Sequence, residues 1–168
     1  MPESLPESPL EKVAKILLSH GVEFIVIGGQ AELAYGSPRP TVDVDLCYRR
    51  TGDNLRRLAD ALRELKPTLR NAPPELPFII DARTLELGNN FTFTTSVVDL
   101  DLLGWVEPLG DYENVARRAL KMTVGNMELQ IIDLEDLIRI KQHIGRPKDR
   151  ESLSQLLAIK RVRDEQSQ

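Results

Sequence analysis

Two aspartates separated by a single residue, Asp43 and Asp45, constrain this chain more than any other feature of its sequence. They lie in an alternating segment, 41–48, in which three large apolar residues fall on one face and the aspartates, with Thr41 and Cys47, on the other. These apolar residues are Val42, Val44 and Leu46. Alternation with a period of two predicts a half-buried strand, so both carboxylates should leave the same face, with Cα atoms roughly 6–7 Å apart.

Two carboxylates placed in this way repel each other, and a hard divalent cation relieves the repulsion. Mg²⁺ takes oxygen ligands and is usually held by one or two carboxylates together with substrate phosphates. The pattern therefore predicts a cation site at Asp43 and Asp45, for Mg²⁺ or Mn²⁺. A solvated pair balanced by the neighbouring Arg39 or Arg49 explains a lone Asp-x-Asp equally well, and the surrounding sequence has to decide.

An apolar, β-branched run at 23–27 precedes this segment and ends at Gly28-Gly29. Such a run predicts a buried strand, and 30–35 predicts a short helix after it. Glycines between a strand and a helix allow the backbone to approach a phosphate closely. An ordinary tight turn also explains them, and the segment matches neither a Walker loop nor Gly-x-Gly-x-x-Gly.

A second pair of aspartates, Asp99 and Asp101, alternates with large apolar residues in 97–103. This segment predicts another strand, with 91–95 as its neighbour. Two cations that bridge the attacking and leaving oxygens need more carboxylates than one pair supplies. The second pair therefore offers the third carboxylate of the same site.

Capping residues, glycines and prolines in the sequence predict the remaining elements. Ser8-Pro9 with Glu11 forms a capping box that opens a helix ending near Gly21. We expect the following further elements: a helix at 53–65 capped by Asp53, a loop at 66–77, a helix at 112–120, a hairpin at 121–132 turning at 125–126, a helix from 133 to 143, and a last helix at 148–163. Helices and strands without strict alternation predict an α+β (mixed α/β) fold, with a mixed sheet flanked by helices. We expect one domain over 1–168, with a core at about 9–134 and a C-terminal helical pair at about 134–163.

Composition excludes several classes of protein. The 168 residues are 41% hydrophobic and 29% charged, which is typical of a globular domain. No apolar run approaches the roughly 20 residues that span a bilayer, so we expect no membrane partner. A single cysteine, Cys47, fits a reducing cytoplasmic location, and we interpret it as a buried residue. The net charge of −4 argues against general nucleic-acid binding, although 139–163 is locally basic.

Taken together, these motifs resemble the signature of the nucleotidyltransferase superfamily that includes DNA polymerase β. The matching residues are Gly28-Gly29-Gln-Ala followed by Arg39-Pro-Thr41-Val-Asp43-Val-Asp45. The nearer resemblance is to the bacterial branch of AbiE-type toxin nucleotidyltransferases and small uncharacterised relatives. In that branch, 91–104 resembles the third-carboxylate strand, and 133–149 resembles the C-terminal helix-turn-helix.

The resemblance implies a role for each matching residue. Gly28 and Gly29 would hold a nucleoside triphosphate, Asp43 and Asp45 would bind Mg²⁺, and Asp101 rather than Asp99 would complete the site, because Leu-Leu-Gly follows it. The resemblance also implies four further nucleotide-binding candidates: Arg39, Thr41, Lys141 and Lys148. A solvated helix end explains the two lysines equally well. The best-known members have Gly-Ser where this chain has Gly28-Gly29.

The resemblance implies transfer of a nucleoside monophosphate to an acceptor hydroxyl, with release of pyrophosphate. The acceptor would be a tRNA end, a protein hydroxyl or a small molecule such as an antibiotic, and a toxin of a toxin–antitoxin pair is one such enzyme. The alternative is a catalytically silent module of the same fold that binds RNA or an antitoxin through the basic segment 139–163.

Overall fold

A mixed sheet of seven strands forms the centre of the computed structural model, which describes residues 5–73, 75 and 78–167. The strand order is β3-β4-β5-β2-β1-β7-β6. The strands are β1 (Phe24–Ile27), β2 (Val44–Tyr48), β3 (Thr68–Leu69), β4 (Asn90–Thr94), β5 (Asp99–Leu103), β6 (Leu120–Val124) and β7 (Met127–Ile131). β2 pairs antiparallel with β1 and parallel with β5, and β1 is parallel to β7. The predicted mixed sheet is therefore confirmed.

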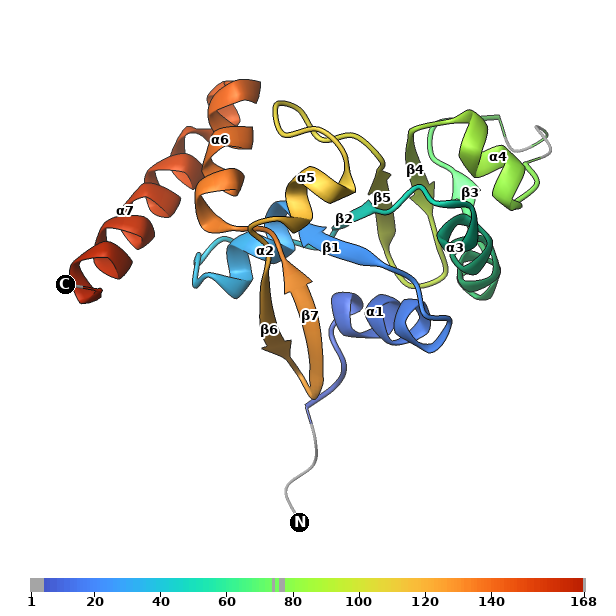
Figure 1. The fold of residues 1–168 in the computed structure, drawn as a ribbon, viewed down its shortest axis with the longest axis horizontal. Coiled ribbons are helices and arrows are strands. Elements are labelled where there is room, and N and C mark those ends of the chain that lie inside the picture. Colours follow the sequence, from blue (N-terminus) through green and yellow to red (C-terminus); the bar gives the residue numbers. More distant parts are fainter. Residues whose placement is uncertain (1–4, 74, 76–77, 168) are drawn as a thin grey trace, which may run out of the picture.

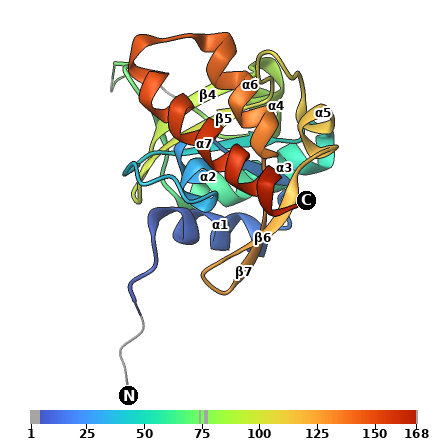
Figure 2. The same ribbon diagram turned by 90° about the vertical axis from the view of Figure 1, so that its left-hand side faces the viewer.

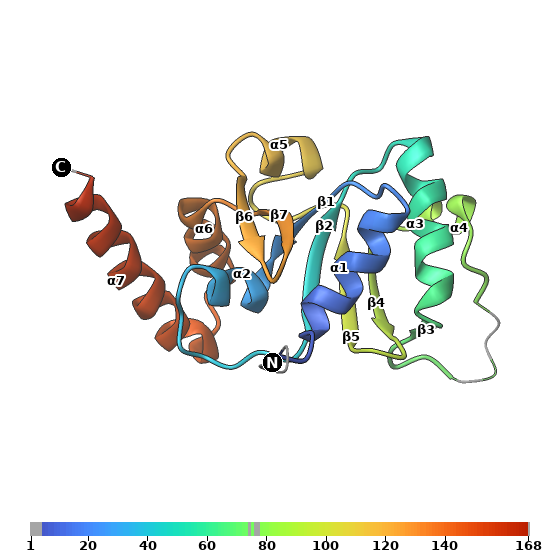
Figure 3. The same ribbon diagram turned by 90° about the horizontal axis from the view of Figure 1, so that it is seen from below.

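Within the described residues, seven helices and one 3-10 turn lie around or beside this sheet (Figure 1). They are α1 (Pro9–Ser19), α2 (Gly28–Ala34), α3 (Gly52–Glu64), α4 (Ala82–Leu87), α5 (Tyr112–Ala116), α6 (Leu134–Ile144), η1 (Pro147–Asp149) and α7 (Arg150–Gln166). Seen from below, α1 and α3 lie on one face of the sheet (Figure 3). The C-terminal pair, α6 and α7, lies at one end of the molecule, and the far end of α7 points away from the sheet (Figures 1 and 2). No helix in the described part of the chain has the length and apolarity needed to cross a bilayer.

Local signals explain where several elements begin and end. The Ser8 hydroxyl accepts a hydrogen bond from the Glu11 amide at 3.2 Å, and the Glu11 carboxylate accepts one from the Ser8 amide, which is the predicted capping box. The predicted hairpin turns at Gly125, whose φ is 62°. Helix α6 ends at Gly145 in the left-handed conformation, as a C-terminal glycine permits.

Other boundaries differ from the sequence expectation. The cap of α3 is Thr51 instead of Asp53, because the Thr51 hydroxyl accepts from the Asn54 amide. The helix expected at 112–120 stops at Ala116, because the chain enters the hairpin. Helix α4, capped by Asp81, was not predicted. The loop expected at 66–77 contains the two-residue strand β3. Residues 74, 76 and 77 of that loop lie outside the described residues. Helix α7 begins at Arg150, after the 3-10 turn that Pro147 opens.

The strand expected at 41–48 begins three residues late, at Val44. The side-chain amide of Gln30 donates to the carbonyl oxygen of Asp43 at 3.2 Å, so α2 holds this stretch of backbone outside the sheet ladder. Val42 is consequently 71% exposed instead of packing in the core. From Val44 onward the alternation holds, and Val44 and Leu46 are fully buried.

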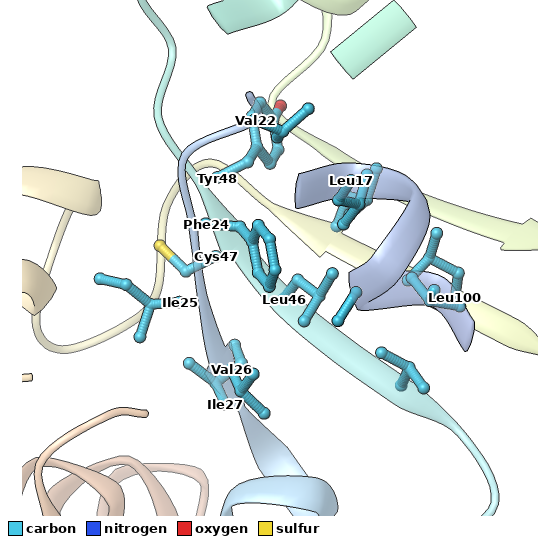
Figure 4. Packing of buried hydrophobic residues seen from close by; sticks show 14 of the residues in the cluster. Leu17, Val22, Phe24, Ile25, Val26, Ile27, Leu46, Cys47, Tyr48 and Leu100 are labelled. Carbon is cyan, nitrogen blue, oxygen red and sulfur yellow. The ribbon is translucent and has the colours of Figure 1, made fainter. Parts of the chain in front are cut away.

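The main core lies between α1 and the central strands. Leu17 of α1 packs near Phe24, Leu46 and Leu100, while Cys47 points to the opposite side of the strand (Figure 4). The interpretation of Cys47 as a buried residue is confirmed. Because side chains alternate along β2, Asp45 lies on the same face as Cys47, away from α1.

We expect Leu46→Ala to lower the free energy of unfolding by about 2–5 kcal/mol, because it leaves a cavity in a fully buried strand. Val42→Ala, just before this strand, is the matched control, and its effect should stay within about 0.5 kcal/mol because Val42 is exposed. Urea unfolding followed by circular dichroism measures both. Equal losses in the two variants would contradict the observed start of β2.

Candidate active site

The two glycines between β1 and α2 lie against the side chains of the Asp-x-Asp segment. Gly28 has a φ of 64°, and a Cβ atom placed on it would lie 2.1 Å from Oδ2 of Asp45. A Cβ atom on Gly29 would lie 2.5 Å from Oγ1 of Thr41. No side chain fits at either position. The glycines are therefore required by a close approach between this backbone and the acidic segment, and an ordinary turn is not a sufficient explanation.

Asp45 and Asp101 lie directly beside each other on adjacent parallel strands. The pairing of β2 with β5 places Asp45 opposite Asp101, and the pairing of β1 with β2 places Asp45 opposite Ile27. Burial raises the pKa of Asp45, and the charge and hydrogen bond of Asp101 act in the same direction, so that the pKa reaches about 7. Without a cation, Asp45 is therefore harder to ionise than an ordinary aspartate.

Asp43 occupies a different position from the one that the alternation predicts. It precedes β2 instead of lying in it, and its side chain is exposed. Its charge still contributes to the raised pKa of Asp45, so the two residues are electrostatic neighbours. Within the described ranges, no group of three or more His, Cys, Asp or Glu side chains already has the arrangement of a metal site.

The donor set nevertheless fits a hard divalent cation. Asp45 and Asp101 are neighbouring carboxylates on paired strands, and burial together with the charge of Asp101 raises the pKa of Asp45, which disfavours a second negative charge there. A divalent cation compensates that charge, and carboxylate oxygen is the ligand type that Mg²⁺ prefers. Asp43 stands at the edge of this pair, where it adds a third carboxylate.

Arg70 also reaches this pair, although sequence reasoning did not select it. Its Nη2 atom donates to Oδ1 of Asp101 at 2.9 Å, and its Nε lies 3.6 Å from Oδ2 of Asp99. Asp99 therefore faces Arg70, while Asp101 contacts both Arg70 and Asp45. No signal in the sequence marked Arg70, because it follows a two-residue strand inside a segment expected to be loop.

A pocket of about 360 Å³ lies beside the glycines and gathers most of the remaining candidates. It is lined by Gly29, Glu32, Arg39, Pro40, Thr41, Asp43, Lys141, Arg146, Lys148, Asp149 and Ser152. The four side chains that were predicted to bind nucleotide come from a loop, α6 and η1, and all four line this one pocket. Its four cations exceed its three carboxylates, and because Lys141 and Arg146 are already paired with Glu32 and Asp149, Arg39 and Lys148 are the cations best suited to meet an anionic ligand.

Lys141 is not a solvated helix end, because its side chain is only 14% exposed and is bound by two carboxylates. Its Nζ lies 3.1 Å from Glu32 and 3.4 Å from Asp149. Asp149 also accepts a hydrogen bond from Nε of Arg146 at 2.7 Å. Burial alone would raise the pKa of Asp149, but Arg146 and Lys141 outweigh it and hold this pKa below its usual range. Glu32, Arg146 and Asp149 are pocket residues that were not selected from the sequence.

Arg39 and Lys148 differ from Lys141 in their surroundings. The Nη1 atom of Arg39 donates to the hydroxyl of Ser152 on α7, which fixes the arginine at the pocket without a carboxylate partner in that contact. Lys148 lies on η1 with an exposed side chain. Both cations can turn toward a ligand more readily than Lys141 can.

A second pocket, of about 230 Å³, adjoins the first and is mostly apolar. Its lining consists of Ile27, Gly28, Gly29, Asp45, Asp101, Leu103, Val106, Leu137, Ile140, Lys141, Ile144 and Arg146. The two pockets share Gly29, Lys141 and Arg146. Asp45 and Asp101 line the apolar pocket, and the residues shared with the polar pocket lie between the two.

No protein-family model and no curated protein sequence matches the chain. Solved structures do match. A candidate nucleotidyltransferase from Thermotoga maritima is 15% identical, with a TM-score of 0.56, over 89% of this chain and 90% of that one. The lincosamide antibiotic adenylyltransferase LnuA with lincomycin bound is 13% identical, with a TM-score of 0.60, over 94% and 99%.

A third match is the enzyme ANT(2'')-Ia in complex with adenylyl-2''-tobramycin. It is 14% identical, with a TM-score of 0.58, over 89% of this chain and 86% of that one. These likenesses extend over nearly the whole described chain at low identity, so they establish architecture. The mixed seven-stranded sheet with its C-terminal helices is the nucleotidyltransferase fold.

Proposed function

We propose that this chain is a magnesium-dependent nucleotidyltransferase that moves a nucleoside monophosphate from a nucleoside triphosphate to an acceptor hydroxyl. The observation that carries the proposal is the in-register pair of Asp45 and Asp101, which lies against Gly28 and beside a cationic pocket. A cytoplasmic location, where nucleoside triphosphates are made, belongs to the same proposal.

Each part of the site has a defined task in this reaction. Asp43, Asp45 and Asp101 would hold Mg²⁺ or Mn²⁺, which when bound neutralises negative charge on the phosphates. Gly28 and Gly29, at the start of α2, would contact the triphosphate through their backbone amides. The side chains that would contact the nucleotide are Arg39, Thr41, Lys141 and Lys148.

The acceptor oxygen would form a bond to the α-phosphorus while the bond from that phosphorus to the bridging oxygen breaks, and pyrophosphate leaves. The proton of the acceptor hydroxyl passes to a carboxylate, for which Asp101 is placed, because it lines the apolar pocket next to Asp45. Glu32 and Asp149 hold Lys141 at the pocket and keep its ammonium group from moving freely.

The acceptor that these features favour is a small molecule with a hydroxyl group. Two of the similar proteins are the lincosamide antibiotic adenylyltransferase LnuA, with lincomycin bound, and ANT(2'')-Ia, in complex with adenylyl-2''-tobramycin. Ion pairs also neutralise much of the basic segment that was expected to bind RNA or an antitoxin: Arg139 with Asp136, Lys141 with Glu32, Arg146 with Asp149, and Lys160 with Glu135. A tRNA or protein acceptor, and a toxin role of the AbiE type, are the alternative within the same fold.

We expect Asp101→Asn to lower the rate of monophosphate transfer by about 10³-fold or more, because it removes both a cation ligand and the proton acceptor. Asp99→Asn is the matched control two residues away on the same strand face, and we expect a loss of less than about tenfold. The assay follows transfer of label from α-³²P-labelled nucleoside triphosphates to a panel of hydroxyl-bearing small molecules, purified tRNA and cell extract. Equal activity in the wild type and Asp101→Asn would refute the assignment.

We also expect the cation-free protein to lose stability as the pH rises. The folded-state pKa of Asp45, about 7, lies above its unfolded value of roughly 4, so ionisation favours the unfolded chain between these two pH values. The loss should be on the order of a few kcal/mol and complete above pH 7.

Thermal unfolding in a chelator at pH 5 and pH 8 measures this loss. Asp45→Asn should flatten the pH dependence, and millimolar Mg²⁺ should restore stability to the wild type at pH 8, since a cation that binds only the folded state stabilises it. A wild type that is as stable at pH 8 as at pH 5 in chelator, with no gain from Mg²⁺, would contradict the cation site.

A further inference from the structure

Arg70 is fixed in place by β4 before it reaches the acidic pair. Its backbone amide donates to the carbonyl of Thr92 at 3.0 Å, and its Nη2 atom donates to the carbonyl of Phe93 at 2.9 Å. Thr92 in turn pairs across the ladder with Asp101. Both ends of the arginine are thus anchored to the strand next to Asp101, and its side chain is only 23% exposed.

The guanidinium group holds one particular oxygen of Asp101. Nη2 lies 2.9 Å from Oδ1, which fixes the orientation of the carboxylate and leaves its other oxygen for Asp45 or a ligand. Nε of Arg70 is buried, has no hydrogen-bond partner among the residues that the structure describes, and lies 3.6 Å from Oδ2 of Asp99. The arginine therefore places a permanent positive charge beside the acidic pair, in contact with Asp101 of that pair and with the neighbouring Asp99.

We propose that Arg70 is a built-in counter-charge that orients Asp101 and weakens the hold of the Asp45–Asp101 pair on a divalent cation. This inference rests on the proposed function, because it assigns a positioning residue for that reaction. A fixed positive charge near a cation site repels the incoming cation. When no cation is bound, the same charge reduces the repulsion between the two carboxylates.

The two consequences of this charge have opposite signs. Without Arg70 the site should bind a cation more tightly, because the repulsion disappears. It should also react more slowly, because Asp101 loses the contact that fixes its Oδ1 atom, and small misplacements of reacting groups are costly. If Arg70 had only a structural role, its removal would loosen the site, and both the cation affinity and the reaction rate would fall.

The test replaces Arg70 by methionine, which keeps the length of the side chain and removes its charge. Mn²⁺ serves as the probe, and its binding is measured by electron paramagnetic resonance of the free ion, with no nucleotide present. We expect the Kd for Mn²⁺ to fall roughly three- to tenfold in Arg70→Met. Arg70→Lys keeps the charge and should bind Mn²⁺ within about twofold of the wild type.

Arg63→Met is the matched control. Arg63 lies in α3 and, like Arg70, donates hydrogen bonds to a carboxylate (Asp60) and to a backbone carbonyl (Ile80). Its Mn²⁺ affinity should equal that of the wild type. Circular dichroism shows whether each variant folds, and Arg70→Gln takes the place of Arg70→Met if the latter does not. In chelator the folded Arg70→Met should melt earlier than the wild type, and Mn²⁺ should restore more of its stability.

Turnover is measured separately, so that the two proposals can fail independently. We expect kcat to fall roughly ten- to a hundredfold in Arg70→Met with little change in the KM for the nucleoside triphosphate, and Arg70→Lys to recover part of it. Unchanged or weaker Mn²⁺ binding by Arg70→Met overturns the counter-charge, whatever the turnover. Tighter binding in a chain that transfers no nucleotide supports the counter-charge and rejects the proposed function.

Discussion

The contact between Asp45 and Asp101 is the constraint on which the rest of the site depends. Strand pairing forces the two residues into register on adjacent parallel strands, and the surrounding core leaves little water to screen them. A fold of this size can keep such a pair only if something compensates its charge. In the cation-free protein the raised pKa of Asp45 favours its uncharged form and Arg70 pairs with Asp101, and a divalent cation can replace or supplement both arrangements.

The glycines and the two pockets are arranged around this pair. Gly28 has no space for a side chain because Asp45 lies against it, so a bound phosphate at the glycines would be adjacent to the carboxylates. The cationic pocket and the apolar pocket meet at Gly29, Lys141 and Arg146. An anionic substrate and a second, less polar one can therefore approach the same carboxylates from two sides, which is the requirement for a transfer reaction.

Much of this could be predicted from the sequence, because the signals are local. Alternation identified the faces of β2 and β5, and the capping box and Gly145 marked helix ends. The features that were not predicted depend on contacts between residues that are distant in the chain. Asp43 leaves the strand because Gln30 binds its carbonyl, and Arg70 reaches Asp101 only after β3, β4 and β5 have paired. Lys141 likewise owes its position to Glu32, more than a hundred residues earlier.

The most direct test of the central claim is to locate the cation. Crystals grown with Mn²⁺ and a non-hydrolysable nucleoside triphosphate analogue, with diffraction recorded at the manganese absorption edge, give its position without reference to activity. We predict an anomalous peak in contact with carboxylate oxygens of Asp45 and Asp101, with the triphosphate lying along Gly28 and Gly29. A nucleotide bound elsewhere, or a peak that touches neither aspartate, would contradict the account.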